Sequence, residues 1–120
     1  MQHGLGGWSN CLFSKCTILA IPSFRDRIPV IVDEVTTICG PGELIDVIIC
    51  ERGIAINPAR KDLLSAVSKT SLPVHDINLL LKDVQKICGG KPEKPKYDKD
   101  FVAAIKWVDG TVIDALRQVL

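Results

Sequence analysis

The sequence has no long hydrophobic run and no excess of charge of either sign. A membrane-spanning helix needs about 20 consecutive apolar residues, and the apolar runs here are far shorter. The 15 Lys and Arg residues nearly balance the 14 Asp and Glu residues. Such a balance lacks the basic surface that phosphate backbones and anionic lipids attract. We therefore expect no membrane span and no nucleic-acid partner.

Metal-binding and disulfide patterns are also missing. The five cysteines are odd in number and form no Cys-x-x-Cys pair, which indicates neither a zinc site nor a disulfide framework. Cys50 and Cys88 fall in apolar patterns, where a thiol behaves as a small hydrophobic group. The first eight residues lack the positive and apolar segments of a secretory signal. These features predict reduced thiols, no metal and a cytoplasmic location.

Common catalytic and nucleotide-binding motifs are absent as well. The chain has no Gly-x-x-x-x-Gly-Lys phosphate loop and no Gly-x-Ser-x-Gly nucleophile elbow. Neither of its two histidines has a partner that the spacing identifies. His75 lies at a predicted helix start, where a polar residue near the cap is the ordinary explanation.

What the chain has in quantity is hydrophobic surface. Hydrophobic residues make up 47% of the 120 positions, and the mean hydropathy is +0.22. A chain of this length buries roughly two-thirds of its unfolded surface in one domain. The composition is rather apolar for a free-standing domain, so we expect some of this surface to lie against a partner.

Short apolar runs predict strands at residues 16–21 and 28–32, buried on both faces, and at residues 46–50. Gly40, Pro41 and Gly42 predict a turn before the last of these. After a short extended piece at residues 72–74, residues 76–88 have helical spacing that ends at Gly89. The apolar positions of this helix are Ile77, Leu80, Leu81, Val84, Ile87 and Cys88.

A second helix is predicted over residues 58–70, because Asn57 suits a helix cap and Pro58 suits the first helical position. Leu63, Leu64 and Val67 would form its buried stripe. The loop before this helix could receive an anion at its backbone donors. The alternative is that Arg60 and Lys61 form a solvated first turn.

The C-terminal part predicts a linker followed by a β-hairpin. Residues 91–99 contain two prolines and four lysines, and we expect these lysines to be solvated. Residues 101–108 and 111–119 flank Asp109-Gly110, which is typical of a two-residue hairpin turn. Tyr97 and Trp107 are expected to pack here. The pattern predicts one α/β domain with a mixed sheet over residues 1–120, in which residues 1–14 are poorly ordered.

The candidate functional site is the segment from Glu51 to Asn57, which follows the predicted strand at residues 46–50. Ligands of open α/β sheets bind at the carboxyl ends of strands, so an acid and a base there are site candidates. An ordinary polar turn is the competing interpretation.

Several segments resemble the alpha chain of citrate lyase. They include Arg27-Ile28-Pro29-Val30-Ile31-Val32, Gly40-Pro41-Gly42-Glu43, Asp46-Val47-Ile48, Glu51-Arg52-Gly53-Ile54-Ala55-Ile56-Asn57-Pro58 and Asp109-Gly110-Thr111-Val112-Ile113-Asp114. Arg117-Gln118-Val119 extends the last of these. The agreement covers residues 15–119 and corresponds to the C-terminal part of that family. The family's glycine-rich loop is altered here, with Trp8, Asn10 and Cys11 in place of its His, Asp and Thr.

The resemblance implies a citrate CoA-transferase, also called a citrate:acyl-carrier-protein transferase. Such an enzyme exchanges acetyl for citrate on a CoA or phosphopantetheine thioester, which is a substrate and not a bound cofactor. The implied partners are the citrate lyase beta chain and the acyl carrier protein, or gamma chain. The implied fold is CoA-transferase-like, with helices on both faces of a mixed sheet.

The resemblance also assigns roles to the candidate residues. Glu51 would act at the catalytic site, electrostatically or by organising Arg52, and not as a covalent nucleophile. Arg52, Gly53 and Asn57 would border the substrate, with Arg52 paired to a citrate carboxylate and Asn57 acting mainly as a cap. The competing hypothesis is a non-catalytic assembly module of a citrate lyase complex. A regulatory CoA binder is a third possibility.

Overall fold

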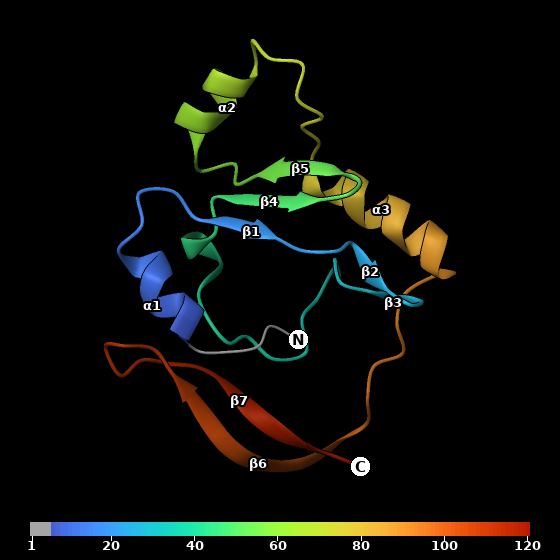
Figure 1. Ribbon diagram of the computed structural model, residues 1–120. Helices are drawn as coiled ribbons and strands as arrows, with labels where there is room; N and C mark the ends of the chain where they lie inside the picture. The colour runs from blue at the N-terminus through green and yellow to red at the C-terminus, as the bar shows by residue number, and fades with distance from the viewer. Residues whose placement is uncertain (1–5) are drawn as a thin grey trace.

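The computed structural model describes residues 6–120, and these residues form small sheets and three short helices (Figure 1). The elements are α1 (Gly6–Leu12), β1 (Ile18–Ala20), β2 (Phe24–Arg25), β3 (Ile28–Pro29), the 3-10 turn η1 (Gly42–Leu44), β4 (Val47–Cys50), β5 (Gly53–Ile56), α2 (Lys61–Val67), α3 (Ile77–Cys88), β6 (Tyr97–Lys106) and β7 (Val112–Val119). The mixed α/β class and the C-terminal hairpin are confirmed. The α1 helix, within the segment expected to be poorly ordered, was not predicted; residues 1–5 of that segment lie outside the described residues.

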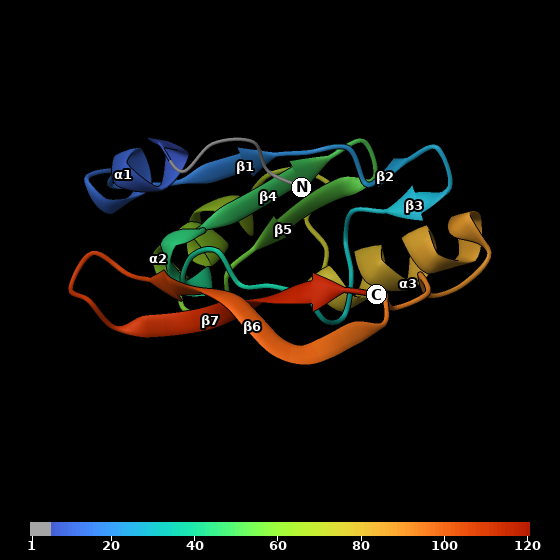
Figure 2. The same cartoon turned by 90° about the horizontal axis from the view of Figure 1, so that it is seen from below.

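The central sheet has the strand order β1-β4-β5, with β1 parallel and β5 antiparallel to β4. Figure 2 shows the three strands side by side, with α3 next to the small β2–β3 hairpin. A bridge at Ile54–Val74 adds the extended piece after α2 to the far side of β5. The sheet is therefore mixed, as the sequence predicts.

Two strand predictions are wrong in detail. Residues 16–21 form only the three-residue β1, and Ile18 at its start is exposed. Residues 28–32 contribute only Ile28 and Pro29 to a two-stranded hairpin with β2. Burial on both faces requires a layer on each side of the sheet, and the described residues do not provide both layers here.

The α3 helix is the element that the sequence predicts most closely. Asp76 caps it by accepting a hydrogen bond from the Asn78 backbone N–H at 2.8 Å. Gly89 ends it in the left-handed conformation, with φ at 85°, which glycine adopts without a Cβ penalty. Leu80 and Val84 of α3 are buried with Ile31 and Ala55 in the hydrophobic core.

The α2 helix differs from its prediction. It begins at Lys61, with Arg60 at the N-cap position, and ends at Val67. None of its residues is buried, and Leu64 of the predicted stripe is exposed. Asn57 instead stabilises the turn before the helix, because its Oδ1 accepts a hydrogen bond from the Ala59 N–H at 3.0 Å.

The C-terminal hairpin has a longer turn than predicted. Trp107 N–H donates to the Thr111 carbonyl at 2.8 Å, so Val108, Asp109 and Gly110 form a three-residue loop. Gly110 has a φ of 89°, as expected where a type I turn is followed by a left-handed residue. The linker ends at Lys96, because β6 begins at Tyr97. Two of its lysines are paired and not simply solvated: Lys91 with Asp33 and Lys94 with Glu34.

Candidate functional site

The candidate residues lie at the turn that joins β4 to β5. Cys50 pairs with Gly53 across the two strands, so Glu51 and Arg52 form a two-residue hairpin turn. The second apolar run therefore returns antiparallel to β4 as β5, and the turn at Asn57 joins it to α2. Glu51 and Arg52 are both exposed at this end of the sheet.

The Glu51 side chain accepts hydrogen bonds from a neighbouring loop, at Ser23. Its carboxylate accepts hydrogen bonds from the Ser23 backbone N–H, at 3.3 Å to Oε1 and 3.0 Å to Oε2, and from the Ser23 hydroxyl. Ser23 is completely buried, and a buried donor is costly to leave without a partner. The hydroxyl bond, together with backbone N–H groups, lowers the pKa of Glu51. An ionised acceptor of this kind suits a positioning role.

Arg52, in contrast, makes only a long and exposed ion pair. Its Nε lies 3.8 Å from Oδ2 of Asp83 on α3, and the two side chains are 39% and 50% exposed. Exposed ion pairs at this separation contribute little to stability. The guanidinium group therefore has donors available for a carboxylate or phosphate ligand, which it can bind with two parallel hydrogen bonds.

Gly53 permits close packing behind the turn. It is buried, and a Cβ built on it would lie 2.5 Å from His75 Cδ2 and 2.9 Å from the Pro73 carbonyl oxygen. Ile54 N–H donates to that carbonyl at 3.0 Å, and His75 N–H donates to the Ile54 carbonyl at 2.8 Å. Gly53 thus allows the segment from Pro73 to His75 to pack along β5.

Asn57 lies at the opposite end of β5 from Glu51 and Arg52. Its Nδ2 donates to the Ile45 carbonyl at 3.0 Å, and its backbone N–H donates to the Asp46 carbonyl at 2.8 Å. The structure therefore brings Glu51, Arg52 and Gly53 together and separates Asn57 from them by the length of the strand.

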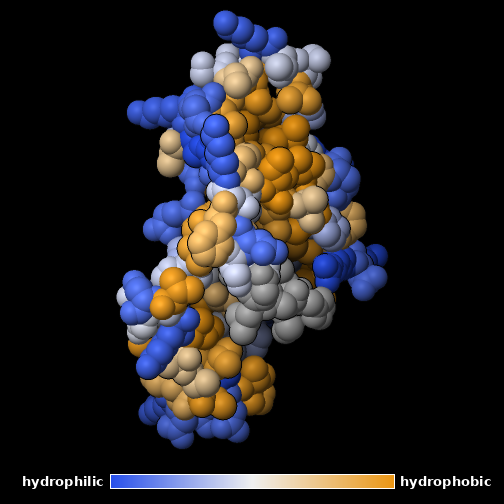
Figure 3. Space-filling model, turned by 60° about the vertical axis from the view of Figure 1, so that its left-hand side comes forward, coloured by the Kyte–Doolittle hydropathy of each residue, from blue (hydrophilic) through white to orange (hydrophobic). Residues whose placement is uncertain are grey.

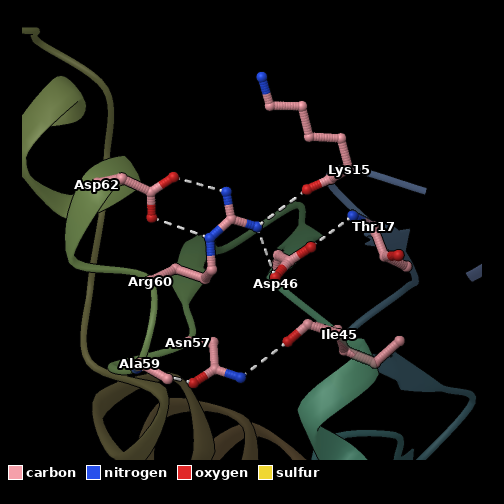
Figure 4. A network of polar contacts seen from close by, with 8 residues as sticks. All are labelled: Lys15, Thr17, Ile45, Asp46, Asn57, Ala59, Arg60 and Asp62. Atoms are coloured by element: carbon pink, nitrogen blue, oxygen red, sulfur yellow. Dashed lines mark hydrogen bonds and ion pairs between the residues drawn. The ribbon is translucent and has the colours of Figure 1, made fainter. Parts of the chain in front are cut away.

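A polar network around Arg60, shown in Figure 4, was not predicted from the sequence. Arg60 Nη1 lies 2.7 Å from Asp46 Oδ1, and Nη2 lies 2.7 Å from Asp62 Oδ2. Arg60 Nε donates to Asp62 Oδ1 at 2.9 Å, and Nη1 also donates to the Lys15 carbonyl at 3.3 Å. The prediction of a solvated Arg60 is wrong, because its guanidinium ties α2 to the segments around β1 and β4.

The network also lowers the pKa values of its two acids, Asp46 and Asp62. The Thr17 backbone N–H donates to Asp46 at 2.7 Å and, together with Arg60, lowers the Asp46 pKa. Hydrogen bonding to Arg60 lowers the pKa of Asp62 from 3.8 to about 2, and both acids raise the pKa of Arg60. No signal in the local sequence identifies this network, since Asp46 and Arg60 are far apart in the chain.

We expect stability to fall in acid. Because folding lowers the pKa of Asp62 from 3.8 to about 2, its contribution to stability is complete above about pH 4 and is lost as the pH falls toward about 2. The urea midpoint measured between about pH 5 and about pH 2.5 should therefore fall with pH. An Asp62→Asn variant should show a shallower fall, whereas an equally steep fall would contradict this account.

Two cavities lie away from the turn. One of about 320 Å³ lies between β3 and the end of α3, and one of about 240 Å³ lies between α1 and the β6–β7 hairpin. Glu51, Arg52, Gly53 and Asn57 line neither cavity. Among residues 6–120, no group of three or more His, Cys, Asp or Glu side chains could hold a metal ion, and no helix is long and apolar enough to cross a membrane.

The fold defines a mixed α/β protein in which a polar hairpin turn presents an available arginine. Comparison with known proteins is more specific, because the family model for the citrate lyase alpha subunit matches residues 2–119. The chain belongs to the citrate lyase alpha subunit family. The resemblance inferred from the sequence is thereby confirmed.

Individual relatives agree with this assignment. The chain is 38% identical over 106 residues to the citrate lyase alpha chain of Haemophilus influenzae, covering 88% of this chain and 21% of that one. It is 38% identical over 103 residues to the Klebsiella pneumoniae chain, covering 86% and 20% respectively. The sequence thus spans about a fifth of the length of these relatives.

A solved structure is also similar. It is the putative alpha subunit of citrate lyase from Streptococcus mutans, in complex with citrate. The TM-score is 0.91 at 36% sequence identity, and the match covers 96% of this chain and 22% of the other. The small sheets and the long hairpin described above therefore have a counterpart within a much longer alpha-subunit chain.

Proposed function

We propose that this chain contributes to the transferase step of a citrate lyase complex. In that step an acetyl thioester and citrate react to give a citryl thioester and acetate, on CoA or on the phosphopantetheine of an acyl carrier protein. The observation that supports this function best is the 0.91 TM-score to a putative alpha subunit solved with citrate. The beta chain and the acyl carrier protein would be its partners, in the cytoplasm, and the complete fold would be CoA-transferase-like.

Arg52 is the residue of this chain best suited to bind citrate. Citrate carries three carboxylates, and Arg52 lies at an exposed turn with only a weak contact to Asp83. Glu51, next to it, would act as a positioning residue, because its carboxylate already accepts three hydrogen bonds from Ser23. Gly53 would support the turn from behind. Asn57 would shape the distant end of β5 and would not contact citrate.

A chimera tests these roles in a complete subunit. Residues 1–120 would replace the matching segment of the Streptococcus mutans alpha subunit, and citrate-dependent thioester exchange would be measured. Arg52→Ala should raise the KM for citrate by about tenfold or more, because a charge-assisted bond is lost. Arg52→Lys should have a KM for citrate between those of the unsubstituted chimera and Arg52→Ala, since a lysine keeps the charge but cannot form two parallel hydrogen bonds to a carboxylate.

The matched control is Lys86→Ala, which removes another exposed cation, on α3. If Arg52→Ala and Lys86→Ala have the same KM, the assignment of Arg52 is wrong. Glu51→Gln should lower the unfolding temperature of the chimera, because a neutral amide replaces the carboxylate that holds Ser23. A loss of kcat without any loss of thermal stability would instead place Glu51 in the chemistry.

An assembly module is the second candidate function. It is favoured by the large exposed apolar surface, which includes Phe13, Ile18, Val35 and the strands of the C-terminal hairpin. An inactive chimera that still assembles with the beta chain and the acyl carrier protein would favour this candidate.

A further inference from the structure

The chain exposes far more surface than a self-contained domain of its mass. Its accessible area is 8862 Å², whereas a monomeric protein of 13.1 kDa is expected to expose about 6400 Å². Its radius of gyration is 16.0 Å, compared with about 14 Å for a compact domain of this length. The difference in area, about 2500 Å², is roughly three times what one partner buries in a standard interface.

The C-terminal hairpin accounts for a large part of this open surface. Figure 1 shows β6 and β7 as a long ribbon lying apart from the β1-β4-β5 sheet, and among residues 6–120 the two strands pair only with each other. No residue of β6 or β7 is buried. An isolated two-stranded hairpin is marginally stable in water, so a ribbon of this length is expected to pack against something.

Both faces of the ribbon are open. Consecutive residues of a strand point to opposite faces, and directly paired residues share a face. Leu116 and Arg117 are consecutive on β7 and therefore point to opposite faces. Ala103 pairs with Leu116, whereas Phe101 pairs with Arg117, because a register shift typical of a β-bulge lies between Phe101 and Ala103. The Arg117 guanidinium lies over the Phe101 ring, 5.8 Å from its centroid, so these two side chains share a face. Leu116 is 44% exposed and Phe101 is 66% exposed. A single flat contact would therefore cover only one of these two side chains.

Only a few contacts hold the ribbon to the rest of the described chain. Asp114 Oδ2 accepts a hydrogen bond from the Ile38 N–H at 2.9 Å, and Arg117 Nη1 donates to the Thr36 carbonyl at 3.4 Å. These contacts orient the ribbon without covering its apolar side chains. The space-filling view in Figure 3 shows hydrophobic residues gathered at the lower end of the molecule, where the hairpin lies, and over its upper part.

We propose that the β6–β7 ribbon is a docking element that inserts into the remaining part of a citrate lyase alpha-subunit fold. This fold occupies 22% of the Streptococcus mutans chain at a TM-score of 0.91, so the rest of that chain is available to enclose the ribbon. A second copy of this chain fits less well, because a two-fold contact between ribbons uses one face of each. The inference rests on the proposed function in naming the partner, but it concerns assembly and not chemistry.

The test is complementation between two separate chains. The 120-residue chain would be co-expressed with the Streptococcus mutans alpha subunit lacking its matching segment, with that segment itself as the positive control. We expect a one-to-one complex, and protection of the β6 and β7 amides from hydrogen exchange only in that complex. Failure of the 120-residue chain to co-purify, or an insoluble remainder despite co-expression, would overturn the proposal.

Substitutions on each face sharpen the result. Phe101→Asp and Leu116→Asp should each weaken the complex by about tenfold or more, because both place a charge in a covered apolar face. Ile28→Asp on β3 is the matched control, since Ile28 is as exposed as Phe101, and it should change the affinity much less. Sensitivity to only one of the two ribbon variants, or a homodimer that one of them disrupts, would overturn enclosure and favour a second copy.

Thioester exchange by the reconstituted complex separates the two proposals. A complex that forms through both faces but has no citrate-dependent exchange would uphold docking and contradict the transferase function. Conversely, an active chimera whose separated parts do not associate would uphold the function and contradict docking by the ribbon.

Discussion

Replacing Gly53 with alanine should destabilise the chain more than any other change at the candidate site. Gly53 has a φ of 143°, and a Cβ there would lie 2.5 Å from His75 Cδ2 and 2.9 Å from the Pro73 carbonyl oxygen. A φ of 143° is a backbone conformation in which L residues are strained, and the two close contacts of the added Cβ would overpack the site. Together these effects should cost about 3 kcal/mol or more. Urea unfolding followed by circular dichroism would measure the loss.

Gly42→Ala provides the control for this substitution. A Cβ at Gly42 would meet no atom within 4 Å, and Gly42 does not have a positive φ. Its replacement should change the free energy of unfolding by no more than about 0.5 kcal/mol. Equal free energies for the two variants would show that the packing of His75 against β5 does not constrain this turn. Because Gly53 lies next to Arg52, the chimera with Gly53→Ala should also bind citrate more weakly.

The most predictable parts of this fold are those whose determinants are local. The α3 helix has its apolar positions and its terminating Gly89 within one short stretch, and its predicted range agrees with the structure to within one residue. The cap itself is Asp76, which the sequence places as the first helical residue. The C-terminal hairpin was also evident from Asp109 and Gly110, although one more residue joins the loop. In contrast, the sequence predicts that Asn57 caps a helix directly, whereas in the structure it closes a turn before the helix. Its Oδ1 accepts a hydrogen bond from the Ala59 N–H, and its backbone carbonyl accepts one from the Arg60 N–H.

The parts that could not be predicted depend on contacts between distant segments. Ser23 is 28 positions from Glu51, and Asp46 is 14 positions from Arg60, so no local pattern pairs them. Glu51 was identified as a site candidate because of its place after a strand, yet its three hydrogen bonds could be seen only in the folded chain. The same holds for the strands expected to be buried on both faces. Apolar residues indicate burial but do not say which chain provides the covering layer.

Leu80→Ala should produce the second large loss of stability, because the described core is small. Five hydrophobic side chains are buried among the residues that the structure describes: Ile31, Val47, Ala55, Leu80 and Val84. Leu80 is 3% exposed and packs with three of the others in a single cluster. Removing a buried leucine side chain leaves a cavity and typically costs about 3 kcal/mol, which is a large fraction of the stability of a small domain.

The neighbouring Leu79 makes this a matched experiment. It lies on the same helix but is 56% exposed, so Leu79→Ala changes the same residue type with little effect on helix propensity or packing. The free energy of unfolding of the Leu79→Ala variant should differ from that of the unsubstituted chain by about 0.5 kcal/mol or less. If Leu79→Ala were instead as damaging as Leu80→Ala, the exposed side of α3 would be packed in solution. A packing partner for the exposed side of α3 would then be required, in addition to the partner proposed for the β6–β7 ribbon.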